Sequence, residues 1–329
     1  MADRSFVRGA RNWEDDVLQV KVPLPFPLRW VNSYVLRGED GFTVIDPGLH
    51  TGEAELLWEQ TLDGFGIGYA DIEQIVLTHH HPDHYGLAGW FQERSKSPVR
   101  LSATGFEQVN ALWQNGEPMT KRIADLFSKH GLTGDPAEQL VPHLDSFVPL
   151  VSPQPAVTVI EPGTVVKLGS RTCEAIHTPG HAEGHLCFYD RERREMFCGD
   201  HVLPQISPNV SYIPGFDQNP LQSFLDSLRD MQRIEVDKAY PGHREPFAAF
   251  ARRAGELIAH HGERLELMRN SLTEPLTAYE LCVRTFGTRL SIHQLRFALS
   301  ETLAHLFYLQ GQGRVREEER DGTSVFQAC

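Results

Sequence analysis

The sequence predicts an α/β fold, because short apolar runs typical of buried strands alternate with longer stretches of helical character. Strand character is found in residues 17–22, 30–36, 41–45 and 71–78, and it resumes near Val157. Residues 51–66 have helical character, and 104–149 contain two or more helical stretches, including 121–130. Several of the strands end directly before His or Asp, which indicates chemistry at the strand ends.

The strongest such signal is in residues 78–84, which read Thr-His-His-His-Pro-Asp-His after a strand-like run. His79 and His81, one residue apart at a strand end, can reach one metal ion once the chain bends. Pro82 is suited to the first turn of a helix, because it needs no amide partner there. Asp83 and His84 would then be directed at a second ion, and imidazole with carboxylate suits transition metals.

Further candidate ligands follow strands downstream. His181 ends the turn 177–181 and would complete the first ion's ligands. Asp200 follows the run 197–199 and could bridge both ions, while His243 follows 239–242 and would complete the second set. His177, His185 and His201 also flank the ligands, and each is expected to support a ligand histidine or to pack in the core rather than to act as an acid or base.

These motifs identify a resemblance to the metallo-β-lactamase-fold hydrolases, whose core motif is His-x-His-x-Asp-His. The resemblance covers roughly residues 15–245. It implies a four-layer αβ/βα sandwich with two divalent metal ions at one edge, zinc being expected and iron or manganese remaining open. The matching positions are His79, His81, Asp83, His84, His181, Asp200 and His243. Asp46, in Val-Ile-Asp-Pro-Gly, matches the family's first motif and would support the ligands from behind. The asparagine or cysteine variations of true β-lactamases are absent, so glyoxalase II, lactonases and the ribonuclease branches are closer.

Two segments outside these motifs could shape a substrate site. The stretch 106–155 is long for a connection between strands and carries helices of its own. Its apolar side chains either line a pocket or simply pack these helices onto the sandwich, and both readings stay open: Trp113, Met119, Phe127 and Phe147. In the proline-rich loop 201–215, Ser211 or Tyr212 could reach a substrate oxygen, and Tyr212 is the candidate catalytic contact.

We divide the chain into a catalytic domain, 1–245, and a C-terminal domain, 246–329. The latter is predicted to contain helices over 245–270, 276–286 (capped by Thr277) and 291–309, then a hairpin across Asp321-Gly322. Helix, helix, hairpin is a winged-helix pattern. It resembles the tail of the metallo-hydrolase branch that includes a human mitochondrial endoribonuclease and fungal polyketide thioesterases. Arg296 is the only Lys or Arg on the candidate recognition helix, so bracing the pocket or forming a homodimer contact is favoured over nucleic-acid binding.

Composition favours a cytoplasmic enzyme. The net charge is −13, which disfavours an extended phosphate-binding surface. The five cysteines have no paired spacing, and no apolar run is long enough to span a bilayer.

Three functions compete. The first is a dinuclear hydrolase that cleaves a small thioester, ester or lactone by means of a metal-bridging hydroxide, with Asp83 and Asp200 as catalytic carboxylates. The second is a metal-dependent endoribonuclease acting on single-stranded RNA. The third is a non-catalytic winged-helix regulator, against which the complete ligand set counts.

Overall fold

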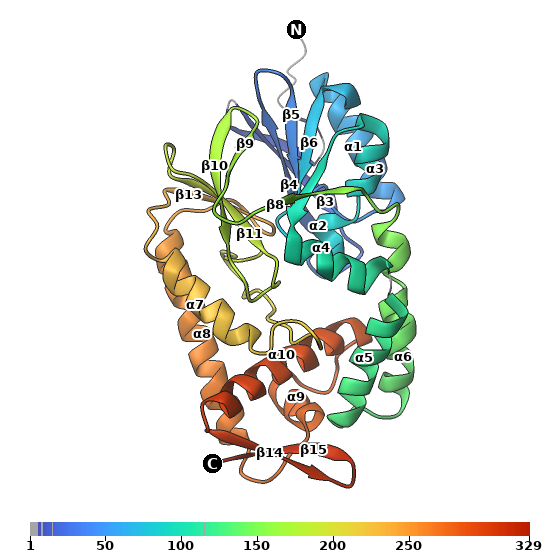
Figure 1. The fold of residues 1–329 in the computed structure, drawn as a ribbon, viewed down its shortest axis with the longest axis vertical. Helices are drawn as coiled ribbons and strands as arrows, with labels where there is room; N and C mark the ends of the chain where they lie inside the picture. Colours follow the sequence, from blue (N-terminus) through green and yellow to red (C-terminus); the bar gives the residue numbers. More distant parts are fainter. Residues whose placement is uncertain (1–5, 8, 15, 115) are drawn as a thin grey trace.

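The computed structural model describes residues 6–7, 9–14, 16–114 and 116–329, and its largest sheet runs in strand order from β1 to β8 (Figure 1). Neighbours from β1 to β5 are antiparallel, and β5 to β8 are parallel. The strands are β1 (Phe6–Val7), β2 (Ala10–Glu14), β3 (Val17–Pro23), β4 (Trp30–Arg37), β5 (Phe42–Ile45), β6 (Ile72–Val76), β7 (Val99–Ser102) and β8 (Val157–Ile160).

A second sheet of five strands has the order β13-β12-β11-β10-β9, in which only the β12–β13 pair is parallel. Its strands are β9 (Val165–Leu168), β10 (Arg171–His177), β11 (Leu186–Asp190), β12 (Glu195–Gly199) and β13 (Lys238–Pro241). Because β5 and β6 are parallel neighbours, as are β12 and β13, the carboxyl ends of each pair lie side by side. This is the part of an α/β sheet where sites commonly form.

Three apolar cores produce the four predicted layers. Between the sheets, Leu36 and Val76 of the first pack with Phe188 and Phe197 of the second. The outer face of the first sheet packs against α1 (Gly52–Phe65) and α3 (Ala88–Ser95), whose Trp58 and Phe91 rings meet edge to face. The second sheet is covered by α7 (Pro220–Met231) and α8 (Phe250–Ser271). The remaining short elements are α2 (Pro82–Tyr85), α4 (Ala103–Val109), the π-helical turn η2 (Asn110–Gln114), and the 3₁₀ turns η1 (Tyr69–Asp71) and η3 (Val148–Val151).

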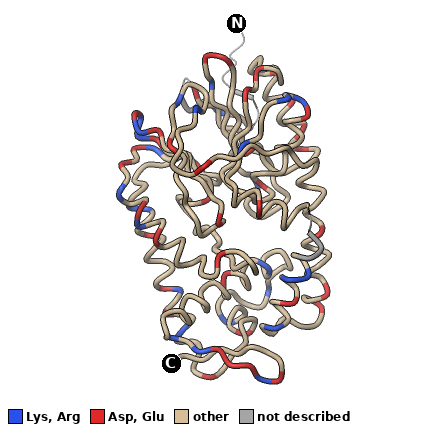
Figure 2. The backbone as a smooth tube through the Cα atoms, viewed as in Figure 1, with Lys and Arg blue, Asp and Glu red and all other residues tan. Residues whose placement is uncertain are grey.

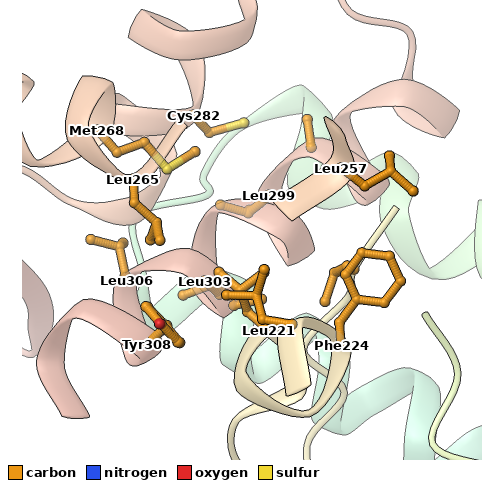
Figure 3. Packing of buried hydrophobic residues seen from close by; sticks show 14 of the residues in the cluster. Leu221, Phe224, Leu257, Leu265, Met268, Cys282, Leu299, Leu303, Leu306 and Tyr308 are labelled. Atoms are coloured by element: carbon orange, nitrogen blue, oxygen red, sulfur yellow. The ribbon is translucent and has the colours of Figure 1, made fainter. Parts of the chain in front are cut away.

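The insertion and the C-terminal segment form a second body beneath the sandwich (Figure 1). The insertion contributes α5 (Gly116–Lys129) and α6 (Asp135–Asp145); the C-terminal segment contributes α9 (Ala278–Phe286), α10 (Ile292–Gly311), β14 (Val315–Arg320) and β15 (Thr323–Ala328). Helix α10 contacts α6, α7, α8 and α9. A single apolar core joins these helices, and Figure 3 shows Leu221 and Phe224 of α7 near Leu299 and Leu303 of α10.

The α/β class, the four layers and the order helix, helix, hairpin in the C-terminal segment are confirmed. Thr277 caps α9 by accepting a hydrogen bond from the Glu280 amide, and Pro82 opens α2 as expected. The division at residue 245 stays a prediction, since the core that contains the C-terminal helices also contains Phe250 and Leu257 of α8.

Candidate metal centre

Three imidazole nitrogens converge where β6 ends. His79 Nε2 lies 3.0 Å from His81 Nδ1, and His181 Nε2 lies 2.9 Å from His81 Nδ1 and 3.3 Å from His79 Nε2. His79 and His81 leave the first sheet, whereas His181 comes from the loop after β10 in the second. The sandwich therefore brings together, at one edge, ligands that are about a hundred residues apart.

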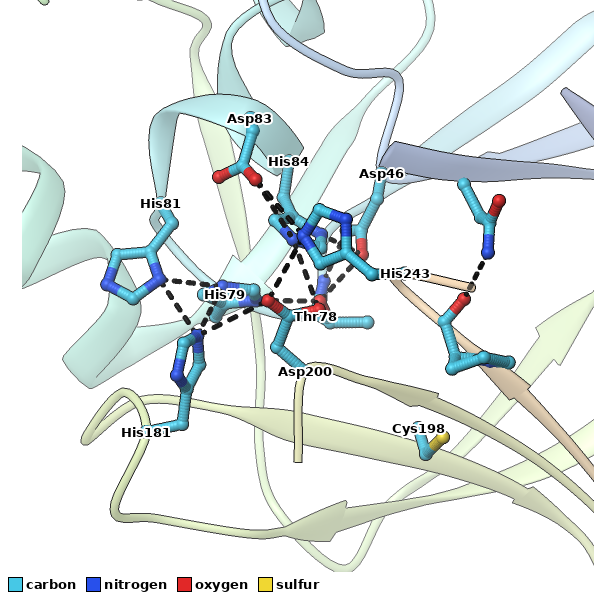
Figure 4. Close-up of polar contacts among 12 residues, drawn as sticks. Asp46, Thr78, His79, His81, Asp83, His84, His181, Cys198, Asp200 and His243 are labelled. Atoms are coloured by element: carbon cyan, nitrogen blue, oxygen red, sulfur yellow. Dashed lines mark hydrogen bonds and ion pairs between the residues drawn. The ribbon is translucent and has the colours of Figure 1, made fainter. Parts of the chain in front are cut away.

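A second group lies beside the first. Asp83 Oδ2 is 3.3 Å from His243 Nε2 and 3.9 Å from His84 Nε2. Asp200 lies between the two groups: its Oδ1 is 3.5 Å from His84 Nε2, and its Oδ2 is 3.4 Å from His243 Nε2 and 3.7 Å from His181 Nε2 (Figure 4). The seven predicted ligand side chains thus meet at one place.

In four of the five ligand rings, the nitrogen that points away from the cluster has its own partner. His84 Nδ1 lies 2.9 Å from Asp46 Oδ2, His79 Nδ1 2.9 Å from Thr78 Oγ1, His181 Nδ1 2.7 Å from the Asn209 carbonyl, and His243 Nδ1 3.0 Å from the Trp30 carbonyl. Such outer partners fix ring orientation and tautomer, leaving the inward nitrogen available to a metal.

Asp46 is held behind the cluster by a backbone turn. Its φ of +50° is rare for a residue with a side chain, and its carboxylate is directed at Thr78, just after β6. There the carboxylate accepts hydrogen bonds from the Thr78 amide (2.8 Å) and the Thr78 hydroxyl (2.6 Å) in addition to its contact with His84. Because these partners occupy both oxygens, we assign Asp46 to positioning His84.

Glycines let the two sheets approach at the site. A Cβ on Gly242 would lie 2.3 Å from Asp200 Oδ1 and 2.6 Å from His84 Cε1. A Cβ on Gly199, whose φ is +45°, would lie 2.6 Å from His185 Nε2. The last residue of β12 and the turn after β13 consequently require glycine.

Burial and charge shape the acid–base properties of the cluster. Burial and the neighbouring rings lower the pKa of His79 and His81 well below the usual range, so both are neutral. Burial opposes protonation of His84, but Asp200, Asp83 and Asp46 together raise its pKa well above the usual range.

The cluster fits divalent metal ions. His84 Nε2, His243 Nε2 and Asp200 Oδ1 are buried and have no hydrogen-bond partner among the described residues, although they face one another. Buried polar atoms of this kind require a partner. Neutral imidazoles and ionised carboxylates are the donors that first-row divalent ions prefer.

The remaining predicted residues lie elsewhere. His177 is exposed, and its Nε2 lies 2.7 Å from the Glu183 carbonyl, so the structure gives it a partner outside the cluster. His185 has the supporting position instead: its Nδ1 lies 2.7 Å from Thr178 Oγ1, and its Nε2 accepts a hydrogen bond from the Asp200 amide at 3.2 Å.

A cavity of about 470 Å³ opens beside the cluster, between the sandwich and the second body. Asp83, His181 and His243 lie in its wall with Trp113 and Phe147 of the insertion. Met119 and Phe127, the other two aromatic or apolar candidates, are buried in the core around the insertion helices. Trp113 and Phe147 therefore line the pocket, as one interpretation of the insertion predicts, whereas Met119 and Phe127 pack its helices, as the other predicts.

Tyr212 also lines this cavity, but its hydroxyl is directed elsewhere. It donates to Gln218 Oε1 at 3.4 Å, and the ring packs edge to face on Phe307. Its catalytic role stays a prediction.

Sequence reasoning favoured a C-terminal segment that braces the pocket or forms a dimer contact, but it did not identify the α10 side chains that line this cavity. His293, Arg296, Phe297 and Glu301 all line it. A helical pattern in the sequence does not indicate which neighbouring element each face of the helix will contact.

Comparison with known proteins agrees with the fold and the cluster. Residues 28–243 match the family model described as metallo-beta-lactamase superfamily, and residues 265–329 match metallo-beta-lactamase-like, C-terminal domain. The chain belongs to the metallo-beta-lactamase superfamily and is a metal-dependent hydrolase. The fold implies divalent metal ions, for which the His and Asp groups are the candidate ligands.

Individual relatives extend over most of the chain. The probable metallo-hydrolase YqjP of Bacillus subtilis is 27% identical over 95% of this chain and 98% of its own length. An atrochrysone carboxyl ACP thioesterase of Passalora fulva is 24% identical over 91% of this chain and 76% of its own. The crystal structure of the metallo-beta-lactamase family protein TTHA1429 from Thermus thermophilus has a TM-score of 0.86 and 33% identity, covering 96% of this chain and 99% of that one.

No helix in the described ranges of the chain is both long and apolar enough to cross a bilayer.

Proposed function

We propose that this hydrolase uses two divalent metal ions to cleave a small thioester or ester, with a lactone as a related substrate. The observation that carries the proposal is the position of Asp200, whose carboxylate oxygens face His181 of the first ligand group and His84 and His243 of the second. One carboxylate between two ligand groups is the arrangement that a metal pair needs. Zinc is the first choice for this imidazole-rich set, and iron or manganese is the alternative.

The assigned ligands of the first ion are His79, His81 and His181, and those of the second are Asp83, His84 and His243, with Asp200 shared. Bound divalent ions would supply Lewis acidity, lowering the pKa of water and polarising a substrate carbonyl.

The chain's own residues then have distinct tasks. Asp83 has one oxygen, Oδ2, directed at His243 and His84, and we assign Oδ1 to orient the attacking water and accept its proton. Although burial acts in the opposite direction, His84 and His243 lower the pKa of Asp83, which keeps it ionised and able to accept. His181 is fixed by the Asn209 carbonyl. The apolar wall of the cavity excludes bulk water and positions an acyl group against the cluster.

The thioester preference draws support from two sources. Relatives that share most of this chain's length carry the name acyl-carrier-protein thioesterase. The cavity is lined largely by apolar and aromatic side chains, including Phe26, Trp113 and Phe297, which suits an acyl group.

Nucleic acid is not favoured as a partner. Figure 2 shows Lys and Arg interspersed with Asp and Glu over the outer helices and the C-terminal hairpin. Helix α10, the candidate recognition helix, is buried along most of its length, from Leu295 to Leu309. A helix enclosed in this way has no face to insert into a groove, so we assign the C-terminal segment to bracing the cavity.

A substrate panel tests the proposal. Zinc-loaded protein is assayed on acyl-CoA thioesters, glutathione thioesters, lactones and single-stranded RNA, with Asp200→Ala as the inactive control. Turnover of a thioester or ester that disappears in the variant is expected. RNA cleavage without acyl turnover would contradict the assignment.

A further inference from the structure

One positively charged side chain in the cavity wall has no role in the chemistry described so far. Among the described residues that line the cavity, Arg296 of α10 is the only Lys or Arg. Its guanidinium carbon lies 4.1 Å from the centre of the Phe297 ring and 5.1 Å from that of Phe147. The two rings hold the guanidinium in place at the junction of α10 and the insertion.

The guanidinium has no anionic partner within the described part of the protein. Its Nε is buried without a hydrogen-bond partner, and none of the described carboxylates lies within ion-pair distance. Burial lowers the pKa of Arg296 to about 10, with Asp83 acting in the opposite direction, so the group is still charged at neutral pH. A partly buried charge without a partner is costly to maintain.

The acidic residues of the cavity wall interact with groups other than Arg296. They are Asp83, Asp200 and Glu301. Asp83 and Asp200 face the metal-centre histidines. Glu301 accepts a hydrogen bond from the Asn209 amide at 2.8 Å and pairs with Arg264 at 3.3 Å. None of these groups neutralises Arg296.

A second unpartnered nitrogen accompanies the guanidinium. His293, one turn earlier on α10, stacks on the Phe26 ring with centroids 4.6 Å apart, and its Nδ1 is buried without a partner. Burial, with the charge of Arg296, lowers the pKa of His293 to about 4, so it is a neutral ring that can donate one hydrogen bond.

We propose that Arg296 binds an oxyanion of the substrate, a carboxylate or phosphate group that lies away from the bond to be cleaved. The guanidinium presents paired N–H donors in a fixed plane, which matches the two oxygens of either group. The apolar wall takes the carbon chain between the oxyanion and the metal centre. The substrate class is therefore an acyl thioester or ester that carries a negative charge. This inference rests on the proposed hydrolase function and adds to it the charge of the substrate.

The test separates the two sources of the oxyanion. Hexanoyl and adipoyl thioesters, which differ by one terminal carboxylate, are each prepared on CoA, which carries phosphates, and on N-acetylcysteamine, which carries none. Succinyl and glutaryl thioesters extend the series and report the distance from the scissile carbonyl to Arg296. Wild type is compared with Arg296→Met, which keeps the packing stem, and Arg296→Lys, which keeps the charge but not the paired donors. Arg289→Met, at an exposed position just before α10, is the matched control.

For Arg296→Met, kcat/KM is expected to fall about 10- to 100-fold on substrates bearing the recognised oxyanion, mainly through KM, and less than about threefold on hexanoyl-N-acetylcysteamine. A loss confined to the adipoyl thioesters identifies the carboxylate of the acyl chain as the oxyanion that Arg296 binds. A loss confined to the CoA thioesters identifies a phosphate of CoA instead. Arg296→Lys should retain part of the preference, and Arg289→Met should match wild type. An equal loss on all four substrates, or no loss on any, would overturn the proposal.

A binding measurement decides the inference separately from turnover. Calorimetric titration compares the mono-N-methylamide of adipic acid with N-methylhexanamide, and CoA with N-acetylcysteamine. Tighter binding of one charged member that is lost in Arg296→Met supports the oxyanion site even if wild type hydrolyses none of the thioesters, in which case the proposed thioester substrate class fails by itself. Equal affinity for charged and neutral members in wild type would overturn the oxyanion site.

Discussion

Replacing Asp46 by asparagine should weaken metal binding although Asp46 is not an assigned ligand. In the native protein Asp46 accepts from the Thr78 amide through Oδ1, and its Oδ2 faces His84 Nδ1 at 2.9 Å. If the asparagine carbonyl keeps the Thr78 bond, its NH₂ group faces His84. An NH₂ group only donates, so Nδ1 must become the acceptor and the proton moves to Nε2. Nε2 is the nitrogen that faces Asp200 and Asp83, and a proton there prevents ligation.

The size of the effect follows from the bond that is lost. A hydrogen bond to a charged group contributes about 1.5–3 kcal/mol, which corresponds to roughly 10- to 150-fold in an equilibrium constant. Loss of an outer partner of a ligand histidine typically costs about 10- to 100-fold in metal affinity. We therefore expect the affinity of the second ion to fall by between one and two orders of magnitude, while the first ion, on His79, His81 and His181, is less affected.

The assay is competition for zinc against a calibrated chelator, read as metal equivalents per chain by elemental analysis. Asp190→Asn is the matched control, because Asp190 is buried at the other end of β11 and accepts from the amides of Glu192 and Arg193. It should bind zinc as wild type does. Wild-type affinity for both ions in Asp46→Asn would refute the tautomer argument.

Three further predictions concern the cluster and its surroundings. Asp200→Ala should lose one metal equivalent and nearly all turnover; normal activity with one ion bound would contradict the shared-carboxylate assignment. Gly242→Ala should lower metal content because its Cβ would lie 2.3 Å from Asp200 Oδ1, whereas Gly262→Ala, with no heavy atom within 4 Å, should retain both ions and unfold at least as late in a thermal melt. Burial raises the pKa of Glu301 from 4.5 to about 7, so the folded protein holds this proton more tightly than the unfolded chain does. The stability that the protonated Glu301 carboxyl contributes is therefore complete below pH 4.5 and is lost as the pH rises through 7. The free energy of unfolding of Glu301→Gln, measured with denaturant, should rise by about 3 kcal/mol relative to wild type between pH 4.5 and 8. Parallel profiles of unfolding free energy against pH for the two proteins would refute this.

Much of the site was predictable because its ligands follow strands. Strand character before His79, Asp200 and His243 indicated β6, β12 and β13. Parallel pairing brings the carboxyl ends of β12 and β13 together, and the packing of the two sheets places them near the end of β6. Short strands without such a motif, β7 and β9 among them, were not predicted, because four residues carry too little periodicity.

The cavity wall was less predictable for a physical reason. Helix α10 is packed against several elements at once, so an amphipathic pattern does not identify the face that carries Arg296. Outer partners such as the Asn209 and Trp30 carbonyls are backbone groups, which leave no residue-type signature. His177, the last residue of β10, is exposed, whereas His185, just before β11, is buried, and the sequence pattern did not distinguish the two.

Anomalous diffraction at the metal absorption edge, from crystals of the zinc-reconstituted protein, tests the central claim most directly. Two peaks are predicted, one among His79, His81 and His181 and the other among Asp83, His84 and His243, with the Asp200 carboxylate between them. A single peak, or metal located away from these side chains, would contradict the account.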